Sequence, residues 1–553
     1  MLQGTDFAST SARTRDVSRP VVLVGFKHMG NLGLGYLAST LRARGYRVEI
    51  LDFEDEFDSI LEAVQRLDPV LVGFSLIFQF YVFRFEEMMR RLREHGVRAH
   101  FTMGGHFPSL SHEHTLELVP QLDSVVRYEG ELTLLELVDT LSVGAEWRTV
   151  TGLAYREGNA VVGTALRPLL GDLDELPYPD RSIEPQLMLG RRVMQVLASR
   201  GCARTCSFCS IHMFYRNAPG KVVRTRKPAE VAREMRMLYD ERGITVFMFQ
   251  DDDFPVFGKL WHQWTRDFIA ELHRNDLPGH VIWKINARAD AIDPELFAEM
   301  RDAGLYLVYM GLESGSDEGL DTLNKLITVE QNLRAVDHIK QLGIMFDFGF
   351  MMLDPSSTFA SIRENVTFLR RIVGDGCTAA EFCRMIPYDG TPIKDELARQ
   401  GRLHGDVCDP DYDFLDPRLY DFFIRINQLL NVTGWIHGLR ALSPQLKFAW
   451  NEVAVLERLF PAVDGLTEYA ESLRRITRAS NEVLFEVVED LADAFEFGRA
   501  PARLPDDLRD QCGVFVDELL ALRDAFIARN EDNLVRALDA DESRRTERLA
   551  APA

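Results

Sequence analysis

Short apolar runs that alternate with helix-like segments restrict the fold of this chain more than any other feature. The first series is VVLVGF (21–26), VEILDFE (48–54), PVLVGFSL (69–76) and AHFTMGG (99–105), with helical segments between the runs. Buried strands separated by helices form a parallel sheet wound on both faces. Because such sheets bind ligands at the carboxyl ends of their strands, we expect ligand contacts in the loops after residues 26, 53, 75 and 105.

A second series of the same kind begins near residue 191. Its strand-like runs include VFMFQDDDF, VIWKINARAD, LYLVYMGLES and MFDFGFMML, again separated by helical segments. About six such repeats are enough for a partial (β/α) barrel. After about residue 400 the strand pattern ends, and residues 416–548 have helical periodicity only.

These patterns predict an α/β fold class with several domains, since 553 residues exceed one ordinary domain. The linker predicted below contains a hairpin pattern (GLAYREGNAVVG) and a proline-rich run (LPYPDRSIEP). The helical region is expected to form a lid or to shape the substrate site, in preference to an oligomerisation module. The expected parts are a disordered tail (1–19), a doubly wound, Rossmann-like domain (20–150), a linker (151–190), a partial barrel (191–400) and an all-α domain (401–553).

Composition narrows the class of protein. A net charge of −22 argues against a nucleic-acid partner. No apolar run of about 18 residues or more is present, and the first residues lack the apolar segment of a signal peptide, so we expect a cytoplasmic protein without a membrane partner. Seven cysteines without paired spacing do not predict disulfides. Four scattered ones are expected to be buried thiols: Cys377, Cys383, Cys408 and Cys512.

The other three cysteines lie close together and predict a metal centre. Cys202, Cys206 and Cys209 form a CxxxCxxC loop after an apolar strand and Gly201. A four-iron cubane is normally held by four thiolates, so three would leave one iron open for another ligand. A structural zinc, with His212 as fourth ligand, is the alternative. The loop follows a strand of the predicted barrel, and barrel active sites lie at the carboxyl ends of strands.

This cysteine spacing resembles that of the radical S-adenosylmethionine (SAM) superfamily. In that family the three cysteines hold a [4Fe-4S] cluster, and the open iron binds SAM. The resemblance continues through DDDF (251–254), KINARAD (284–290), GLESGS (311–316) and the barrel-closing turn IPYDGTP (386–392). Each motif alone could be a charged loop, a surface residue or a helix cap. The SAM contacts that the resemblance implies are Phe208, Asp251, Asp252, Asp253, Asn286, Arg288, Gly311, Glu313 and Ser314.

Residues 20–145 resemble the cobalamin-binding domain found at the amino end of many radical SAM enzymes. The matching segments are NLGLGYLASTLRARGYRVEILD (31–52), VGFSL (72–76), MGGHFPSL (103–110) and YEGELTLLELV (128–138). Small residues after the strands let the backbone approach a flat macrocycle or its nucleotide tail. A doubly wound domain that has lost its ligand is the alternative. The implied cobalamin contacts are Gly73, Ser75, Gly104, Gly105, His106, His28 and Glu129.

The loop after the first strand departs from the better-known cobalamin pattern. Domains that ligate cobalt carry DxHxxG there, whereas this chain has Phe26 in place of the Asp and Asn31 in place of the Gly. His28 is present, but a ligating imidazole is usually held by an acceptor on its other nitrogen. We therefore expect His28 to contact the loop or a propionamide, with the lower face of cobalt open or bound by water.

The resemblance implies a cobalamin-dependent (class B type) radical SAM methyltransferase. One SAM would methylate cobalamin, and a second would yield a 5′-deoxyadenosyl radical that activates a carbon of a small natural-product intermediate. An external flavodoxin- or ferredoxin-type protein would supply the electron. Relatives with this layout also catalyse cyclisation, rearrangement or oxidation without methyl transfer. A non-catalytic cobalamin or redox sensor is the alternative from another class.

Overall fold

The structure, a computed structural model, describes residues 16–436, 438, 440–500 and 505–550. Most of the predicted tail (1–19) therefore lies outside the described residues. The chain divides into two compact units, and both are discontinuous in sequence. Unit 1 comprises the residues up to Glu184 with Ser199–Lys227 and Pro387–Asp411, and unit 2 comprises Pro185–Ala198, Pro228–Ile386 and the residues from Tyr412 onward. The cysteine loop, expected in the barrel domain, thus belongs to unit 1.

Unit 1 contains a sheet with the order β2-β1-β3-β4-β5-β6-β7. The strands from β1 to β5 are parallel, and β6 and β7 form an antiparallel hairpin that pairs with β5. The hairpin expected in the linker therefore extends the sheet. The strands are β1 (Val21–Gly25), β2 (Val48–Asp52), β3 (Leu71–Ser75), β4 (His100–Gly104), β5 (Ser124–Val126), β6 (Leu153–Glu157) and β7 (Ala160–Gly163).

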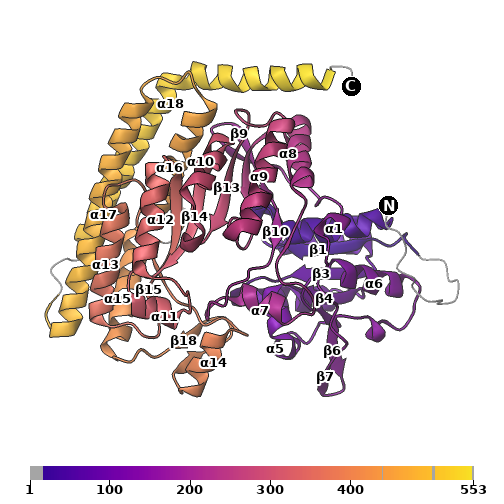
Figure 1. Ribbon diagram of the computed structural model, residues 1–553. Helices are drawn as coiled ribbons and strands as arrows, with labels where there is room; N and C mark the ends of the chain where they lie inside the picture. Colours follow the sequence, from indigo (N-terminus) through magenta and orange to yellow (C-terminus); the bar gives the residue numbers. More distant parts are fainter. Residues whose placement is uncertain (1–15, 437, 439, 501–504, 551–553) are drawn as a thin grey trace. The chain divides into compact units, whose positions relative to one another are not determined.

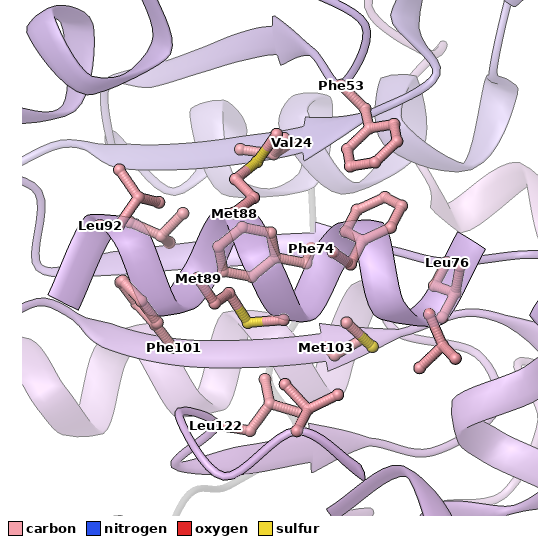
Figure 2. Close-up of a cluster of buried hydrophobic side chains, with 14 of the residues drawn as sticks. Val24, Phe53, Phe74, Leu76, Met88, Met89, Leu92, Phe101, Met103 and Leu122 are labelled. Carbon is pink, nitrogen blue, oxygen red and sulfur yellow. The ribbon is translucent and has the colours of Figure 1, made fainter. Parts of the chain in front are cut away.

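Helices cover both faces of this sheet, which confirms the doubly wound fold. Alternate residues of β1 enter opposite cores: Val22 and Val24 pack in one, and Val21 and Leu23 in the other. Figure 2 shows part of the first core. The helices are α1 (Leu32–Ala43), α2 (Phe57–Leu67), α3 (Val82–Glu94), α4 (His106–Leu110), α5 (His112–Leu118) and α6 (Glu131–Ser142), with short 3-10 turns η1 (Lys27–Met29), η2 (Gln79–Tyr81) and η3 (Trp147–Thr149).

Two later segments complete unit 1. The first contains the hairpin of β10 (Ser199–Arg200) and β11 (Arg224–Thr225), which encloses α7 (Ser210–Arg216); a short 3-10 turn, η4 (Leu173–Glu175), lies earlier, in the part of unit 1 that ends at Glu184. The second contains α14 (Pro392–Arg399) and the paired strands β17 (Leu403–Gly405) and β18 (Pro410–Tyr412). The strands therefore continue to Tyr412, slightly beyond the expected end near residue 400, and the described residues after it form only helices. The strands β17 and β18 are three residues each, too short to give a clear periodic signal.

Unit 2 contains the sheet of the predicted barrel, in the order β16-β15-β14-β13-β12-β9-β8. Neighbours from β9 to β16 pair in parallel, and β8 is antiparallel. The sheet is open, because β16 and β8 are its two edges, which confirms a partial barrel. The strands are β8 (Gln186–Met188), β9 (Arg191–Val196), β12 (Ile244–Phe249), β13 (Ile282–Ala287), β14 (Leu305–Glu313), β15 (Met345–Leu353) and β16 (Cys383–Arg384).

The helices of unit 2 come from the barrel repeats and from the C-terminal region (Figure 1). Helix α13 packs on α17, where Arg370 pairs with Glu482 and Glu489 at 3.0 Å. No helix in the described part of the chain combines the length and hydropathy needed to cross a membrane. The helices are α8 (Pro228–Arg242), α9 (Gly258–Arg274), η5 (Ala289–Ala291), α10 (Pro294–Asp302), α11 (Asp317–Thr322), α12 (Val329–Gln341), α13 (Phe359–Val373), α15 (Arg418–Thr433), α16 (Leu442–Leu459), α17 (Leu466–Phe497) and α18 (Pro505–Ala550).

Candidate functional site

The cysteine loop of unit 1 connects β10 to α7. Gly201 begins it with a φ of 89°, and a Cβ there would collide with the carbonyl oxygen of Val222. The N–H of Cys209 donates to the carbonyl oxygen of Cys206 at 3.3 Å, which closes a turn. Cys206 is buried, whereas Cys202 and Cys209 are half-buried. The turn therefore brings three thiols, none of them in a disulfide, into one short loop.

This donor set fits an iron–sulfur cluster better than a zinc ion. In a cubane each thiolate binds a separate iron, so the sulfurs need not converge on one point. Zinc needs four ligands around a single ion, whereas this loop supplies three thiols. His212 Nδ1 lies 3.0 Å from the carbonyl oxygen of Cys209, and burial lowers the pKa of this imidazole. The side chain of Phe208 is half-buried within the loop.

In unit 2, the predicted SAM contacts lie at the carboxyl ends of the strands, but they differ in burial. Asp251 is fully buried and its Oδ2 accepts a hydrogen bond from the Ala198 N–H at 3.2 Å. Its carbonyl oxygen accepts from Asn286 Nδ2 at 2.8 Å. Asp251 therefore connects the ends of β9, β12 and β13, whereas Asp252 and Asp253 are half-buried.

The GLESGS motif contains one residue with an unusual backbone conformation, Glu313. Glu313 has a φ of 65°, rare for a residue with a side chain, and its Oε1 lies 3.2 Å from Lys325 Nζ. A Cβ at Gly311 would collide with this carboxylate, which explains the glycine. Arg288 is buried and bonds to Asp290 at 2.9 Å. The Lys325 contact and the glycine at position 311 thus fix the position of the Glu313 carboxylate.

Ser314 does not fit the predicted role of a SAM contact. It is completely buried, and its hydroxyl lies 3.2 Å from Asn365 Oδ1. The Gly315 N–H donates to the same Asn365 oxygen at 2.7 Å. Ser314 therefore supports the turn after β14 and has no surface for a ligand.

Sequence reasoning missed a polar surface on one face of the unit 2 sheet. Tyr309 pairs in register with Asn286 and with Asp347 on the neighbouring strands. Lys284, two residues before Asn286, is buried, and burial lowers its pKa to about 8. Lys447 of α16 lies 2.8 Å from Asp347 and is held between two carboxylates. Polar residues at alternate positions of otherwise apolar strands are the signal that could have revealed this face.

The predicted cobalamin residues in unit 1 also divide into two groups. Gly73 lies in the interior of β3, where a Cβ would be 3.0 Å from Leu23, and Gly105 leaves room for the backbone of Leu76. These two glycines are explained by strand packing. Ser75 and Gly104 are the half-buried last residues of β3 and β4, where ligands bind in such sheets.

The two candidate histidines differ in environment. The imidazole of His28 is exposed, and the backbone N–H of this residue donates to Asp52 Oδ2 at 2.7 Å. Asp52 therefore holds the loop backbone, although the expected Asp before His28 is missing. His106 is half-buried with its ring 4.6 Å from that of Phe214, and burial lowers its pKa to about 4. His106 is a neutral imidazole near neutral pH.

Glu129 does not fit the role predicted for it. Both oxygens of its carboxylate contact Arg224 at 2.8 Å, and one also contacts Arg200 at 3.2 Å. A carboxylate already paired with two guanidiniums has little capacity left for a cobalamin amide. The sequence could not reveal this, since the two arginines lie far along the chain.

Comparison with known proteins gives matches to both halves of this arrangement. Residues 19–138 match the B12 binding domain family, and residues 196–369 match the Radical SAM superfamily. An uncharacterized methyltransferase of Pyrococcus horikoshii is 30% identical over 370 residues, which cover 66% of this chain and 77% of that protein. The hopanoid C-3 methylase of Methylococcus capsulatus is 26% identical over 543 residues, covering 93% of this chain and 94% of the methylase.

A solved structure shares the fold. The cobalamin-dependent SAM radical enzyme OxsB, with aqua-cobalamin and SAM bound, aligns with a TM-score of 0.66 at 18% identity, over 95% of this chain and 84% of that chain. The two family matches imply cobalamin, SAM and a [4Fe-4S] cluster as cofactors. The cysteine loop, the strand ends of both units and these matches agree, and the chain belongs to the family of cobalamin-binding radical SAM enzymes.

Proposed function

We propose that this enzyme transfers a methyl group from SAM, by way of cobalamin, to an unactivated carbon of a small natural-product intermediate. The observation that carries this proposal is the presence of both family matches in a chain whose relatives include a hopanoid C-3 methylase along almost its full length. When bound, the cluster supplies the electron that cleaves SAM, and cobalamin supplies a carrier for the methyl group.

The protein side chains would bind and orient these groups. Cys202, Cys206 and Cys209 would hold the cluster and leave one iron for SAM. Half-buried Asp252 and Asp253 are suited to the SAM amino group, since their carboxylates can accept its hydrogen bonds. Phe208, Asn286, Arg288, Gly311 and Glu313 are the further proposed contacts of SAM, and Ser75, Gly104, His28 and His106 are those of cobalamin.

Lys325 would hold Glu313 in place beside SAM, because the two side chains form a nearly buried ion pair. An external flavodoxin- or ferredoxin-type protein would supply the electron. A reducing compartment such as the cytoplasm suits a site that needs three thiolates.

The first experiment uses SAM alone, because the natural substrate is not identified. The anaerobically reconstituted chain with dithionite should release 5′-deoxyadenosine from SAM. A variant with the three loop cysteines changed to Ala should release none. Cys377→Ala is the matched control and should behave as wild type, since Cys377 lies outside the cysteine loop and burial raises the pKa of its thiol to about 12. Absence of 5′-deoxyadenosine would support a non-catalytic sensor instead.

Isotope labelling then separates methyl transfer from the other family reactions. With methyl-deuterated SAM and a small-molecule extract of the cells that encode this chain, the product should carry the labelled methyl group. A product without label would refute methyl transfer and favour cyclisation, rearrangement or oxidation.

A further inference from the structure

Four charged side chains with little solvent exposure meet beside the cysteine loop in unit 1. Glu129 contacts Arg200 at 3.2 Å and Arg224 at 2.8 Å, and Glu131 contacts Arg200 at 2.7 Å. The four side chains are between 1% and 11% exposed, so water screens these charges weakly. Burial opposes ionisation of Glu129, but the guanidiniums of Arg200 and Arg224 hold its pKa below the usual range. Glu129 is therefore a carboxylate that contacts two cations, and together with Glu131 it balances their charge.

Glu129 holds together the hairpin that leads into the cysteine loop. Arg200 of β10 and Arg224 of β11 are directly opposite each other in this hairpin. Like charges at directly opposed positions of paired strands repel and destabilise the pair. Because Glu129 contacts both guanidiniums, its negative charge offsets their repulsion and links the two strands. The strand β10 ends at Arg200, and only Gly201 separates it from Cys202.

The other end of the cysteine loop contacts the same part of unit 1. Helix α7 begins directly after Cys209, and its Phe214 ring lies 5.5 Å from the Tyr128 ring and 4.6 Å from the His106 ring. Tyr128, adjacent to Glu129, has a φ of 65°, and its N–H donates to Ser109 Oγ at 2.8 Å. Residues 128–131 thus hold both ends of the loop that carries the cysteines.

We propose that Glu129 is a positioning residue for the iron–sulfur cluster, acting through Arg200 and Arg224 on the strand that delivers Cys202. It is not a cobalamin contact, because its two oxygens are occupied by the arginines and by the N–H of Leu170 at 3.0 Å. In this role Glu129 fastens the cluster loop to the cobalamin-binding domain within one compact unit. The inference rests on the proposed cluster site but does not depend on methyl transfer.

The test compares Glu129→Gln, which removes the charge, with Glu129→Asp, which keeps it. The full chain is reconstituted with iron and sulfide, and cluster iron is then withdrawn by a chelator. Glu129→Gln should lose iron about tenfold faster than wild type, the lower end of the cost of losing an outer partner of a metal site. It should also alter the electron paramagnetic resonance spectrum of the reduced cluster. Glu129→Asp should recover part of both properties.

Two measurements separate this role from general damage. Hydroxocobalamin binding should be unchanged in Glu129→Gln, whereas a direct cobalamin contact or an unfolded unit 1 would weaken it and overturn the proposal. Glu136→Gln is the matched control, because Glu136 also pairs with an arginine of unit 1, Arg167, outside the hairpin. It should retain iron like wild type.

A double variant tests the electrostatic origin. In Glu129→Gln combined with Arg224→Met, the surplus buried cation is gone, so iron retention should be higher than in Glu129→Gln alone. Additive losses, or wild-type iron retention in Glu129→Gln, would refute the proposal. All these readouts are independent of the substrate, so a failure of methyl transfer would leave them interpretable.

Discussion

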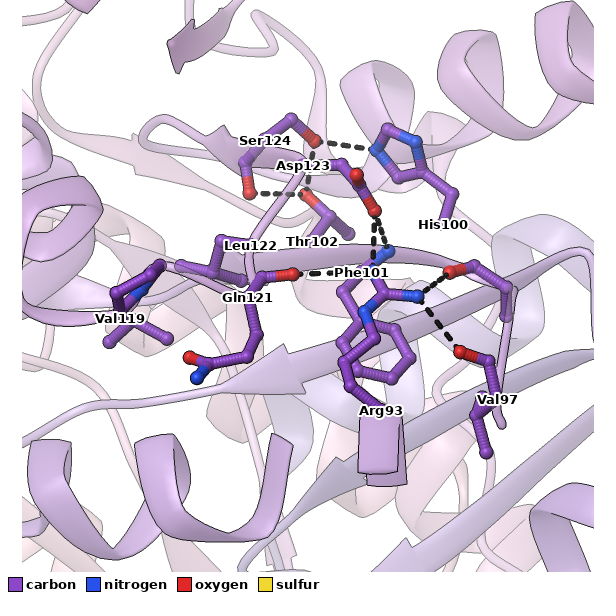
Figure 3. A network of polar contacts seen from close by, with 12 residues as sticks. Arg93, Val97, His100, Phe101, Thr102, Val119, Gln121, Leu122, Asp123 and Ser124 are labelled. Atoms are coloured by element: carbon purple, nitrogen blue, oxygen red, sulfur yellow. Dashed lines mark hydrogen bonds and ion pairs between the residues drawn. The ribbon is translucent and has the colours of Figure 1, made fainter. Parts of the chain in front are cut away.

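His100 should make the folding of unit 1 sensitive to mild acid. This residue begins β4, its Nε2 lies 2.8 Å from Ser124 Oγ, and its ring packs edge-on against Trp147 at 4.7 Å. Figure 3 shows the surrounding network, in which Asp123 accepts from Arg93 at 2.8 Å. Burial lowers the pKa of His100 from 6.5 to about 4, so the native state holds a neutral imidazole.

The sign and size of the effect follow from proton binding. Between pH 6.5 and 4 the unfolded chain binds a proton at His100 that the native state does not bind, so stability falls as the pH falls through this window. The full difference corresponds to roughly 3 kcal/mol, of which roughly 2 kcal/mol is lost at pH 5. The stabilisation is fully present above the unfolded value of 6.5.

Hydrogen exchange of peptides covering β4 and β5 measures this loss, since exchange through global opening reports the free energy of unfolding of the unit. His100→Gln keeps a nitrogen donor for Ser124 but cannot titrate. Between pH 7 and pH 5 the wild type should lose about 2 kcal/mol more than His100→Gln. Equal losses in the two proteins would refute the reasoning, whatever the fixed cost of the substitution.

Two further substitutions test other parts of the structure. Gly201→Ala should lower the iron content after reconstitution, because its Cβ would collide with the backbone carbonyl of Val222. Gly45→Ala is the control and should load iron normally, since Gly45 has a similar φ of 94° and open space around a Cβ. Equal iron contents in the two variants would contradict this view. Lys447→Met should destabilise unit 2 by about 2–3 kcal/mol in urea unfolding, because it leaves Asp347 and Glu381 unpaired. A triple variant that also carries Asp347→Asn and Glu381→Gln has no unpaired carboxylates and should regain stability. Since the pKa of Lys447 is raised from 10.5, the difference between wild type and Lys447→Met should be present below pH 10.5 and disappear as the pH rises through the raised value; a difference that is independent of pH would argue against the ion pairs.

The parallel sheets could be predicted because their strands are buried on both faces. All five residues of β1 are buried, and a short apolar run of this kind between two helices is typical of a strand inside a parallel sheet. The cysteine loop could also be predicted, because its three cysteines lie close together in the sequence. The strands β17 and β18 were missed because each spans only three residues.

The membership of the cysteine loop in unit 1 could not be predicted. It depends on pairs such as Glu129 with Arg224, which are 95 residues apart. A carboxylate after a strand looks the same in sequence whether it binds a cofactor or an arginine. The same ambiguity concealed the structural roles of Asp251 and Ser314, whose burial is decided by tertiary packing.

The C-terminal helix α18 determines when unit 2 can complete its folding during translation. Arg191 opens β9, the first parallel strand of the sheet, and its partner Asp541 is in the last turns of α18, where it also accepts a hydrogen bond from Tyr239 at 2.9 Å. The other parallel strands of the sheet lie between Arg191 and Asp541 in the sequence. On the ribosome, the Arg191 guanidinium therefore lacks this counter-ion until residue 541 has emerged. Unit 2 should consequently complete its folding late, and chaperones that bind exposed sheet edges would act on it for most of its translation.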